Sequence, residues 1–245
     1  MKKITKIIPN IFTLLNLFFG CISIIFLQSK LFEYSAIFTT FSLIFDFLDG
    51  FISRSMKIEN KFGKELDSLA DMVSFGLVPS IIVFLLFQNM NGNQKIIPFI
   101  EWSSFLITIF SAWRLAKFNI TYYMDNKNYG LTTPVNTIFF TSLSIIMKKY
   151  IPSNNINIII KEMIFSPIIM FFIIFFSCYF LITKIPMISF NFYGISWKKN
   201  KKRYLFLLMS LLLLLTLHMV AIPCIIILYM ITSIYFHRFN RKKLH

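Results

Sequence analysis

The feature that most constrains this chain is a series of apolar stretches, each about as long as a lipid bilayer is thick. A helix of about 20 residues, rising about 1.5 Å per residue, crosses the hydrocarbon core. Stretches close to that length lie at 9–28, 31–52, 67–88, 98–118, 130–147 and 163–183. With 57% hydrophobic and only 14% charged residues, they predict an all-α integral membrane protein, a polytopic helical bundle.

The last apolar region, 204–236, is too long for one span. We therefore predict two short helices that turn near residues 218–223, which gives about eight transmembrane helices. With the N-terminus inside, most of the 25 lysines and arginines fall in segments on the inner side. This bias predicts cytoplasmic N- and C-termini. It also explains the net charge of +15 as loop charge that orients the helices in the membrane, so no nucleic-acid partner is expected. Residues 1–245 are predicted to form a single membrane-embedded domain.

Four aspartates stand out in this apolar sequence. Asp46 and Asp49 close the second stretch, and Asp67 and Asp71 open the third. At about 100° per residue, the first pair lies roughly 60° apart and the second roughly 40° apart around its helix, so each pair shares a face. If the two helices pack as an antiparallel hairpin, residues 46–71 bring four carboxylates together.

Such a cluster is costly unless it holds a cation, because like charges repel in a partly desolvated site. Oxygen ligands suit Mg²⁺ or Mn²⁺, which proteins commonly share with substrate phosphates. Gly50 would let a substrate approach the backbone, Arg54 could pair with a phosphate, and Gly63 would loosen the connecting loop. Alternatively the aspartates cap helix ends, as Asp67 could, although capping hardly explains all four.

The stretch reads D-x-x-D-G-x-x-S-R, then eight residues, then G-x-x-x-D-x-x-x-D. This resembles the signature of the CDP-alcohol phosphatidyltransferases, membrane enzymes that exchange the CMP of a CDP-linked lipid for an alcohol. Ser53 stands where the family usually has alanine. Further segments resemble bacterial phosphatidylserine synthases, a branch of this family, with Thr132 where proline is common; they are 8–20, 74–80, 114–119 and 130–134.

The resemblance implies roles for the signature residues. Asp46, Asp49 and Asp67 would bind the metals, with Asp71 also near them and acting as the base for the attacking hydroxyl. The CDP portion would be lined by Gly50, Ser53, Arg54 and Gly63. The implied reaction joins CDP-diacylglycerol and L-serine to give phosphatidylserine and CMP, at the cytoplasmic face of a bacterial inner membrane. The resemblance is also compatible with a homodimer.

Polar residues outside the signature supply further candidates. Asn10, Thr13 and Asn16 follow an i, i+3 stripe that could contact the nucleotide or, equally, other helices. Arg114 is a candidate for the serine carboxylate or a phosphate, because its planar fork suits either anion. Asn119 lies at the same helix end. Lys117, also at this end, is interpreted as one of the basic residues that orient the helices in the membrane.

Three alternatives remain open. Within the family, glycerol 3-phosphate or inositol phosphate could be the acceptor. A membrane prenyltransferase also binds Mg-pyrophosphate through aspartates, but its two acidic motifs are normally far apart in sequence. An ion or metal transporter would need acidic residues near mid-membrane on several helices, whereas these four aspartates cluster at one end of two helices.

Overall fold

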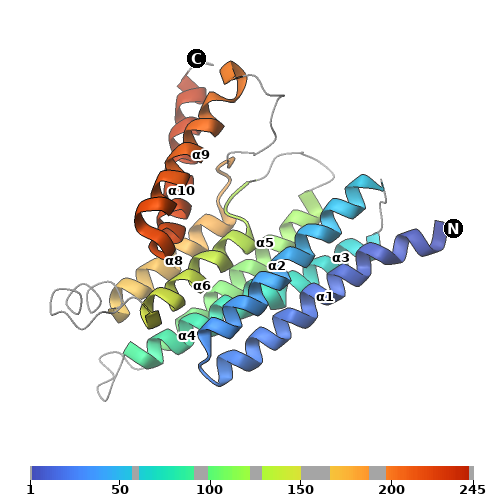
Figure 1. Ribbon diagram of the computed structural model, residues 1–245, viewed down its shortest axis with the longest axis horizontal. Helices are drawn as coiled ribbons and strands as arrows, with labels where there is room; N and C mark the ends of the chain where they lie inside the picture. The colour runs from blue at the N-terminus through green and yellow to red at the C-terminus, as the bar shows by residue number, and fades with distance from the viewer. Residues whose placement is uncertain are drawn as a thin grey trace.

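The computed structural model describes residues 2–56, 61–90, 99–121, 129–149, 166–187 and 197–242. Nearly all of these residues are helical, as the sequence predicts, and the described part includes one isolated bridge, between Tyr129 and Pro186. In chain order the helices are α1 Lys2–Gln28, α2 Phe32–Ser55, α3 Lys61–Asp71, η1 Met72–Leu77, α4 Val78–Met90, η2 Ile100–Phe105, α5 Leu106–Thr121, α6 Thr133–Lys149, α8 Pro167–Ile182, α9 Trp197–Leu217, η3 His218–Val220 and α10 Ala221–Lys242 (Figure 1). The first residues of the predicted spans 98–118 and 163–183 lie outside the described ranges.

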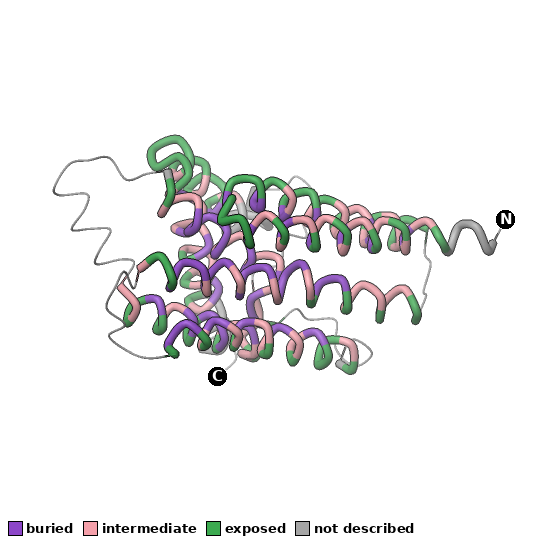
Figure 2. The backbone as a smooth tube through the Cα atoms, turned by 90° about the horizontal axis from the view of Figure 1, so that it is seen from below, coloured by how far each residue is buried: buried purple, intermediate pink, exposed green. Residues whose placement is uncertain are grey.

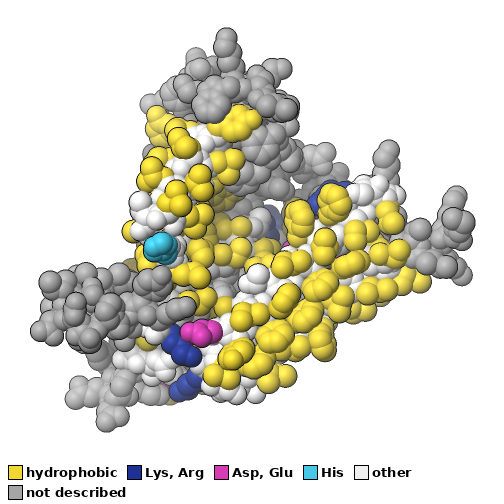
Figure 3. Space-filling view, in the orientation of Figure 1, with side chains coloured by type: hydrophobic (Ala, Val, Ile, Leu, Met, Phe, Trp, Pro, Cys, Tyr) yellow, Lys and Arg dark blue, Asp and Glu magenta, His cyan; other side chains and the backbone are white. Residues whose placement is uncertain are grey.

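Helices α1 and α2 form a long antiparallel hairpin in which aromatic rings pack between the two helices. Phe12, Phe19 and Phe26 recur every seven residues on α1 and therefore share one face of the helix. Phe12 and Phe19 pack on Phe45 of α2 with ring centroids 6.0 and 5.3 Å apart, and Phe26 packs on Phe38 at 5.1 Å. The outward faces of the same two helices carry a continuous field of hydrophobic side chains (Figure 3), as expected for surface that faces lipid.

The third helical run passes through the middle of the bundle. α3, the π-helical segment η1 and α4 follow one another without a break from Lys61 to Met90. This run is the most buried of the long apolar runs, and Figure 2 shows buried backbone concentrated in the interior. Gly20 of α1 lies directly against Ser74 of η1, where any Cβ would overlap the serine side chain. A glycine at this crossing lets α1 approach the central run closely.

The start of the third helix corrects the sequence interpretation. We predicted a span that opens at residue 67, but α3 begins at Lys61. Asp67 therefore lies in the second turn and does not cap the helix, and Gly63 lies within the first turn instead of in the connecting loop. The first part of α3 is polar, so the hydrophobicity of the sequence did not indicate that the helix starts there.

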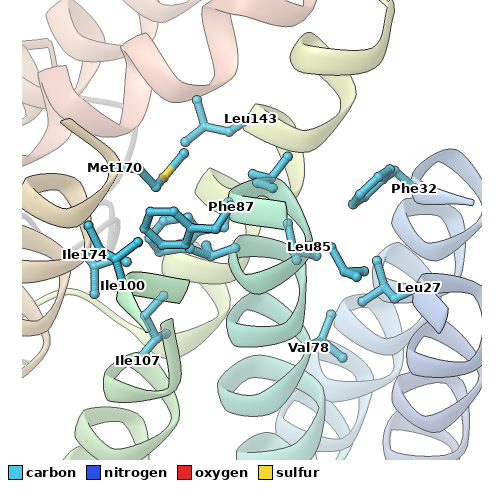
Figure 4. Close-up of a cluster of buried hydrophobic side chains, with 14 of the residues drawn as sticks. Leu27, Phe32, Val78, Leu85, Phe87, Ile100, Ile107, Leu143, Met170 and Ile174 are labelled. Carbon is cyan, nitrogen blue, oxygen red and sulfur yellow. The ribbon is translucent and has the colours of Figure 1, made fainter. Parts of the chain in front are cut away.

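The apolar core lies around α4. Val78, Ile82, Leu86 and Phe87 are almost completely buried and contact side chains of α1, α2, η2, α5, α6 and α8. Figure 4 shows this cluster, with Leu143 and Met170 on one side of Phe87 and with Leu27 and Phe32 at the other end. The core fixes α4 and, through the continuous run, the position of α3.

The approach to α6 is tied to the end of α8. Gly130 donates a backbone hydrogen bond to Ile185, and Leu131 donates one to Phe180, at 3.0 and 2.8 Å. Gly130 has φ +70°, and a Cβ there would lie 2.8 Å from the Phe180 carbonyl oxygen, so glycine is the residue that this turn accommodates.

The final apolar region folds back on itself, as its length predicts. α9 ends at Leu217, His218 has a positive φ of 48°, and α10 starts at Ala221. The rings of Phe206 and Tyr229 lie 5.9 Å apart, so the two helices run side by side (Figure 1). By length and composition, the described residues contain four runs able to cross a membrane, Ile7–Gln28, Phe32–Ser55, Lys61–Met90 and Tyr204–Tyr235, the last of which includes the turn.

Candidate active site

Three of the four signature aspartates converge at one end of the bundle. Asp46 and Asp49 lie on the last three turns of α2, and Asp67 lies on α3. One carboxylate oxygen from each lies within 4.8 Å of the other two. Asp49 is buried and the other two are half-buried. Helical spacing within α2 and the short connection to α3 together explain why residues up to 21 positions apart meet.

Asp71 completes the group from the next turn of α3. Its side chain is 8% exposed and lies within hydrogen-bonding reach of Asp46. The four aspartates that the sequence pairs by spacing therefore form one cluster, although α2 and α3 are joined mainly through α1, on which both pack.

Helix α1 reaches the cluster with two polar side chains. Thr13 Oγ1 donates a hydrogen bond of 2.7 Å to Asp49 Oδ2. Asn16 Nδ2 donates one of 3.2 Å to Asp71 Oδ1. We considered both residues as nucleotide contacts or interhelical contacts, and in this structure they bond to the carboxylates. Asn10, the third member of the stripe, is half-buried one turn before Thr13.

Asn16 is also held in place by serines that the sequence analysis did not single out. Its side-chain oxygen accepts a hydrogen bond from Ser42 of α2, and its backbone carbonyl lies 3.1 and 3.2 Å from the hydroxyls of Ser42 and Ser74. Asn16 is completely buried. The polar stripe on α1 was the only sequence signal of this connection, and it did not identify the partners.

The remaining signature residues lie on the turns of α2 and α3 next to the aspartates. Arg54 is exposed and folds back along α2, with Nη1 3.1 Å from the position of a Cβ on Gly50. Arg54 also interacts electrostatically with Asp46 and Asp49. Ser53 and Gly63 are half-buried near the facing ends of α2 and α3. The guanidinium of Arg54 is therefore the cationic group on α2 that acts on the carboxylates.

A π-helical segment begins immediately after Asp71. In η1 the backbone hydrogen bonds run from residue i to residue i+5 instead of i+4, and hydroxyl groups also contact two of its carbonyls. Thr137 of α6 donates to the Phe75 carbonyl at 3.0 Å, and Ser80 and Thr108 approach the Gly76 carbonyl at 2.9 and 3.2 Å. These neighbours stabilise the distortion, which sequence periodicity did not reveal.

Arg114 reaches the cluster from α5, whereas Asn119 does not. Arg114 interacts electrostatically with Asp71, and its Nε is buried without a hydrogen-bond partner among the described residues. Asn119 instead donates to Glu65 and Ser68 of α3, at 3.3 and 2.9 Å. Asn119 therefore joins α5 to α3, and Arg114 is the better candidate for a substrate anion.

The donor set fits a divalent cation. Three carboxylates within 4.8 Å of one another provide only oxygen ligands, the ligands preferred by Mg²⁺ and Mn²⁺. Asp67 Oδ1 is buried and has no hydrogen-bond partner among the described residues. A buried carboxylate oxygen of this kind is costly without a cation or donor.

Fold and site together define a helical protein of the membrane type, with an acidic cluster suited to a metal-bound phosphate. The chain belongs to the CDP-alcohol phosphatidyltransferase family, whose sequence model matches residues 6–179. It is 35% identical over 144 residues to a CDP-diacylglycerol–serine O-phosphatidyltransferase of Helicobacter pylori J99, covering 58% of this chain and 59% of that protein.

Two archaeal proteins are also similar. A CDP-diacylglycerol–serine O-phosphatidyltransferase of Methanocaldococcus jannaschii is 32% identical over 171 residues, which are 69% of this chain and 76% of that protein. An archaetidylserine synthase of Methanothermobacter thermautotrophicus is 30% identical over 146 residues, or 58% and 60% of the two chains. The family match ends at residue 179, so it covers the site and leaves α9 and α10 outside.

Proposed function

We propose that this protein transfers the phosphatidyl group of CDP-diacylglycerol to L-serine, giving phosphatidylserine and CMP. The observation that carries the proposal is the convergence of Asp46, Asp49 and Asp67 beside Asp71, in a chain of the CDP-alcohol phosphatidyltransferase family. The choice of serine rests on the names of the similar proteins.

The three convergent aspartates are proposed as ligands of Mg²⁺ or Mn²⁺, with Asp71 also at the metal site. Such a cation, when bound, neutralises charge on the pyrophosphate and makes CMP a better leaving group. Arg54 would pair with a phosphate oxygen of the substrate. Gly50, Ser53 and Gly63 would line the CDP portion, and Asn10 would contact the nucleotide from α1.

Asp71 is proposed as the base. The serine hydroxyl oxygen attacks the lipid-side phosphorus, a new P–O bond forms, the P–O bond to CMP breaks, and the hydroxyl proton passes to Asp71. Asn16 already donates to Oδ1 of that carboxylate, so we assign the proton to Oδ2. An aspartate is a weak base for an alcohol, so positioning contributes more than basicity. Thr13 is reassigned from nucleotide contact to orientation of Asp49.

For topology we propose one membrane domain over residues 1–245, with eight spans, both termini in the cytoplasm and the site at the cytoplasmic face of a bacterial inner membrane. The basic residues favour this orientation. Reporter fusions after residue 219 and at the C-terminus test it, because eight spans place the first outside and the second inside. We also propose a homodimer, which crosslinking in membranes tests.

The activity is tested with purified protein in lipid vesicles that contain CDP-diacylglycerol. CMP release is measured with L-serine, glycerol 3-phosphate, inositol phosphate and no acceptor. Release that depends on L-serine and on Mg²⁺ or Mn²⁺ supports the proposal. Selective release with another alcohol would replace serine as the acceptor, and cation flux without CMP release would favour a transporter.

A further inference from the structure

A second group of polar side chains lies beside the acidic cluster, on α5 and α6. Four buried atoms there have no hydrogen-bond partner among the described residues; they are Ser111 Oγ, Arg114 Nε, Thr133 Oγ1 and Asn136 Nδ2. Ser111, Thr133 and Asn136 are at most 1% exposed. Buried polar atoms are nearly always paired in native proteins, so a set of four indicates a bound polar molecule or ordered water.

Thr133 of α6 lies at the depth of Asp71, and Asn136 lies about one turn deeper, at the level of Phe75. Thr137 bonds to the Phe75 carbonyl, which places α6 beside η1, and Leu143 lies near Phe87 further along (Figure 4). α6 and the central run therefore point in the same direction. Thr133 on α6 and Asp71 on α3 each lie one helical turn before the bonded pair, Thr137 and Phe75. Thr133 and Asp71 therefore lie at the same height along the bundle.

The two residues of α5 approach from another side. A Cβ on Gly76 would lie 3.2 Å from the Ser111 side chain, so Ser111 faces η1. Arg114 lies about one turn nearer the acidic cluster and interacts electrostatically with Asp71.

Helix α8 closes the arrangement. It packs on α5, and its Ser177 donates a hydrogen bond of 2.7 Å to Asn136 Oδ1. The bond fixes the asparagine side chain and leaves the two donors of Nδ2 unused. α5 and α6 both pack on η1, so the unpartnered atoms belong to helices gathered around one segment next to Asp71 (Figure 1).

We infer that Ser111, Arg114, Thr133 and Asn136 form the subsite for the amino-acid part of the acceptor, its carboxylate and ammonium groups. A guanidinium N–H and an amide NH₂ match a carboxylate, and the two hydroxyls can donate to it or accept from an ammonium group. A molecule held there can present its hydroxyl to Asp71. The inference rests on the proposed function, because it presupposes an amino-acid acceptor.

The first test compares Thr133→Val with Thr141→Val. The substitutions are isosteric and lie on the same helix, and both remove a buried hydroxyl that has no partner among the described residues. Thr141 lies two turns deeper than Thr133, away from Asp71. We expect Thr133→Val to raise the KM for L-serine about 10-fold, with the KM for CDP-diacylglycerol unchanged. Thr141→Val should leave both constants unchanged, and Thr133→Ser should restore the wild-type KM.

The second test is Asn136→Asp, which places a carboxylate where the substrate carboxylate would bind. Wild-type protein should use L-serine far better than L-serinamide, which lacks the carboxylate. Repulsion should lower kcat/KM for L-serine by at least about 10-fold and leave that for L-serinamide nearly unchanged. A merely structural role would lower both equally.

The outcomes separate the two proposals. If wild-type protein uses L-serine but neither the Thr133 pair nor Asn136→Asp changes selectivity, the site holds only water and the inference is wrong, while the activity stands. If wild-type protein uses an acceptor without a carboxylate, both the proposed function and the assignment of this subsite are wrong. If Thr133→Val does not fold, the Asn136→Asp acceptor ratio alone decides whether the subsite is correct.

Discussion

Asn16 donates a hydrogen bond of 3.2 Å to Asp71, which joins the first helix to the carboxylate proposed as the base. The same asparagine accepts a bond from Ser42 of α2. One side chain of α1 thus links the two helices that carry the aspartates. Helix α1 therefore helps to hold the cluster in place, although it carries none of the signature residues.

The Asn16 link gives a first expectation. Asn16→Ala frees Asp71 to rotate but leaves the carboxylate in place, so kcat should fall about 10- to 100-fold, less than the roughly 100- to 10,000-fold that a positioned base contributes, while the KM for CDP-diacylglycerol changes little. Ser42→Ala removes only the support behind Asn16 and should have a smaller effect. Steady-state CMP release measures both, and an Asn16→Ala enzyme with wild-type kcat would contradict the orienting role.

Asp67 tests the metal site directly. Asp67→Asn keeps the shape of the side chain but removes its charge, so CMP release should fall by more than the roughly 10- to 100-fold typical of lost outer-shell partners. Circular dichroism and detergent extraction should match wild type. Glu65→Gln is the matched control, since Glu65 lies two residues earlier on α3 and is exposed; near-normal turnover by Asp67→Asn would exclude direct metal ligation.

Thr13 should tune metal affinity. Thr13→Val removes the 2.7 Å hydrogen bond to Asp49, which should raise the Mg²⁺ or Mn²⁺ concentration for half-maximal activity about 10-fold and leave the activity at saturating metal close to wild type. Thr40→Val is the control, because among the described residues its hydroxyl bonds to the Ala36 carbonyl of its own helix. Equal metal dependence in the two variants would argue that Thr13 is only a packing residue.

Metal removal gives a further expectation. Protein treated with a chelator should lose CMP release completely and recover it with Mg²⁺ or Mn²⁺, because both suit an all-oxygen site. Ca²⁺ competition then measures how selective the cluster is. Full activity after exhaustive chelation, checked by elemental analysis, would remove the metal from the proposed mechanism.

Gly20 tests the close crossing of α1 and η1. Gly20→Ala places a methyl group against Ser74, whose Cβ and Cα would lie 3.0 and 3.1 Å away. Since backbone must move, we expect a loss of about 1–3 kcal/mol of stability, measured as a lower thermal denaturation midpoint in detergent. Combining it with Ser74→Gly should recover part of the loss, and additive effects of the two substitutions would contradict direct contact.

The sequence predicts much of this architecture because two signals are strong. Long apolar stretches mark the helices, and the length of 204–236 alone predicts the turn that the structure places at His218–Val220. The spacing of Asp46, Asp49, Asp67 and Asp71 predicts the cluster.

Other features depend on tertiary contacts that no local pattern encodes. The early start of α3 at Lys61 lies in a polar segment, and two of the hydroxyl groups that bond to η1 come from α5 and α6. Thr13 and Asn16 were recognisable as a polar stripe, but their partners come from α2 and α3, which a single helix cannot identify.

The π-helical segment also gives the central run one residue more than an α-helix would need. Asp67 and Asp71 precede η1, and the core residues of α4 follow it. Its backbone hydrogen bonds run from residue i to residue i+5 instead of i+4, so one turn holds an additional residue. Removing one residue between Met72 and Leu77 would therefore let the segment become α-helical, with the aspartates still facing α2 and α4 still in the core, and would cost the hydrogen bonds that Thr108 and Thr137 make to its carbonyl groups.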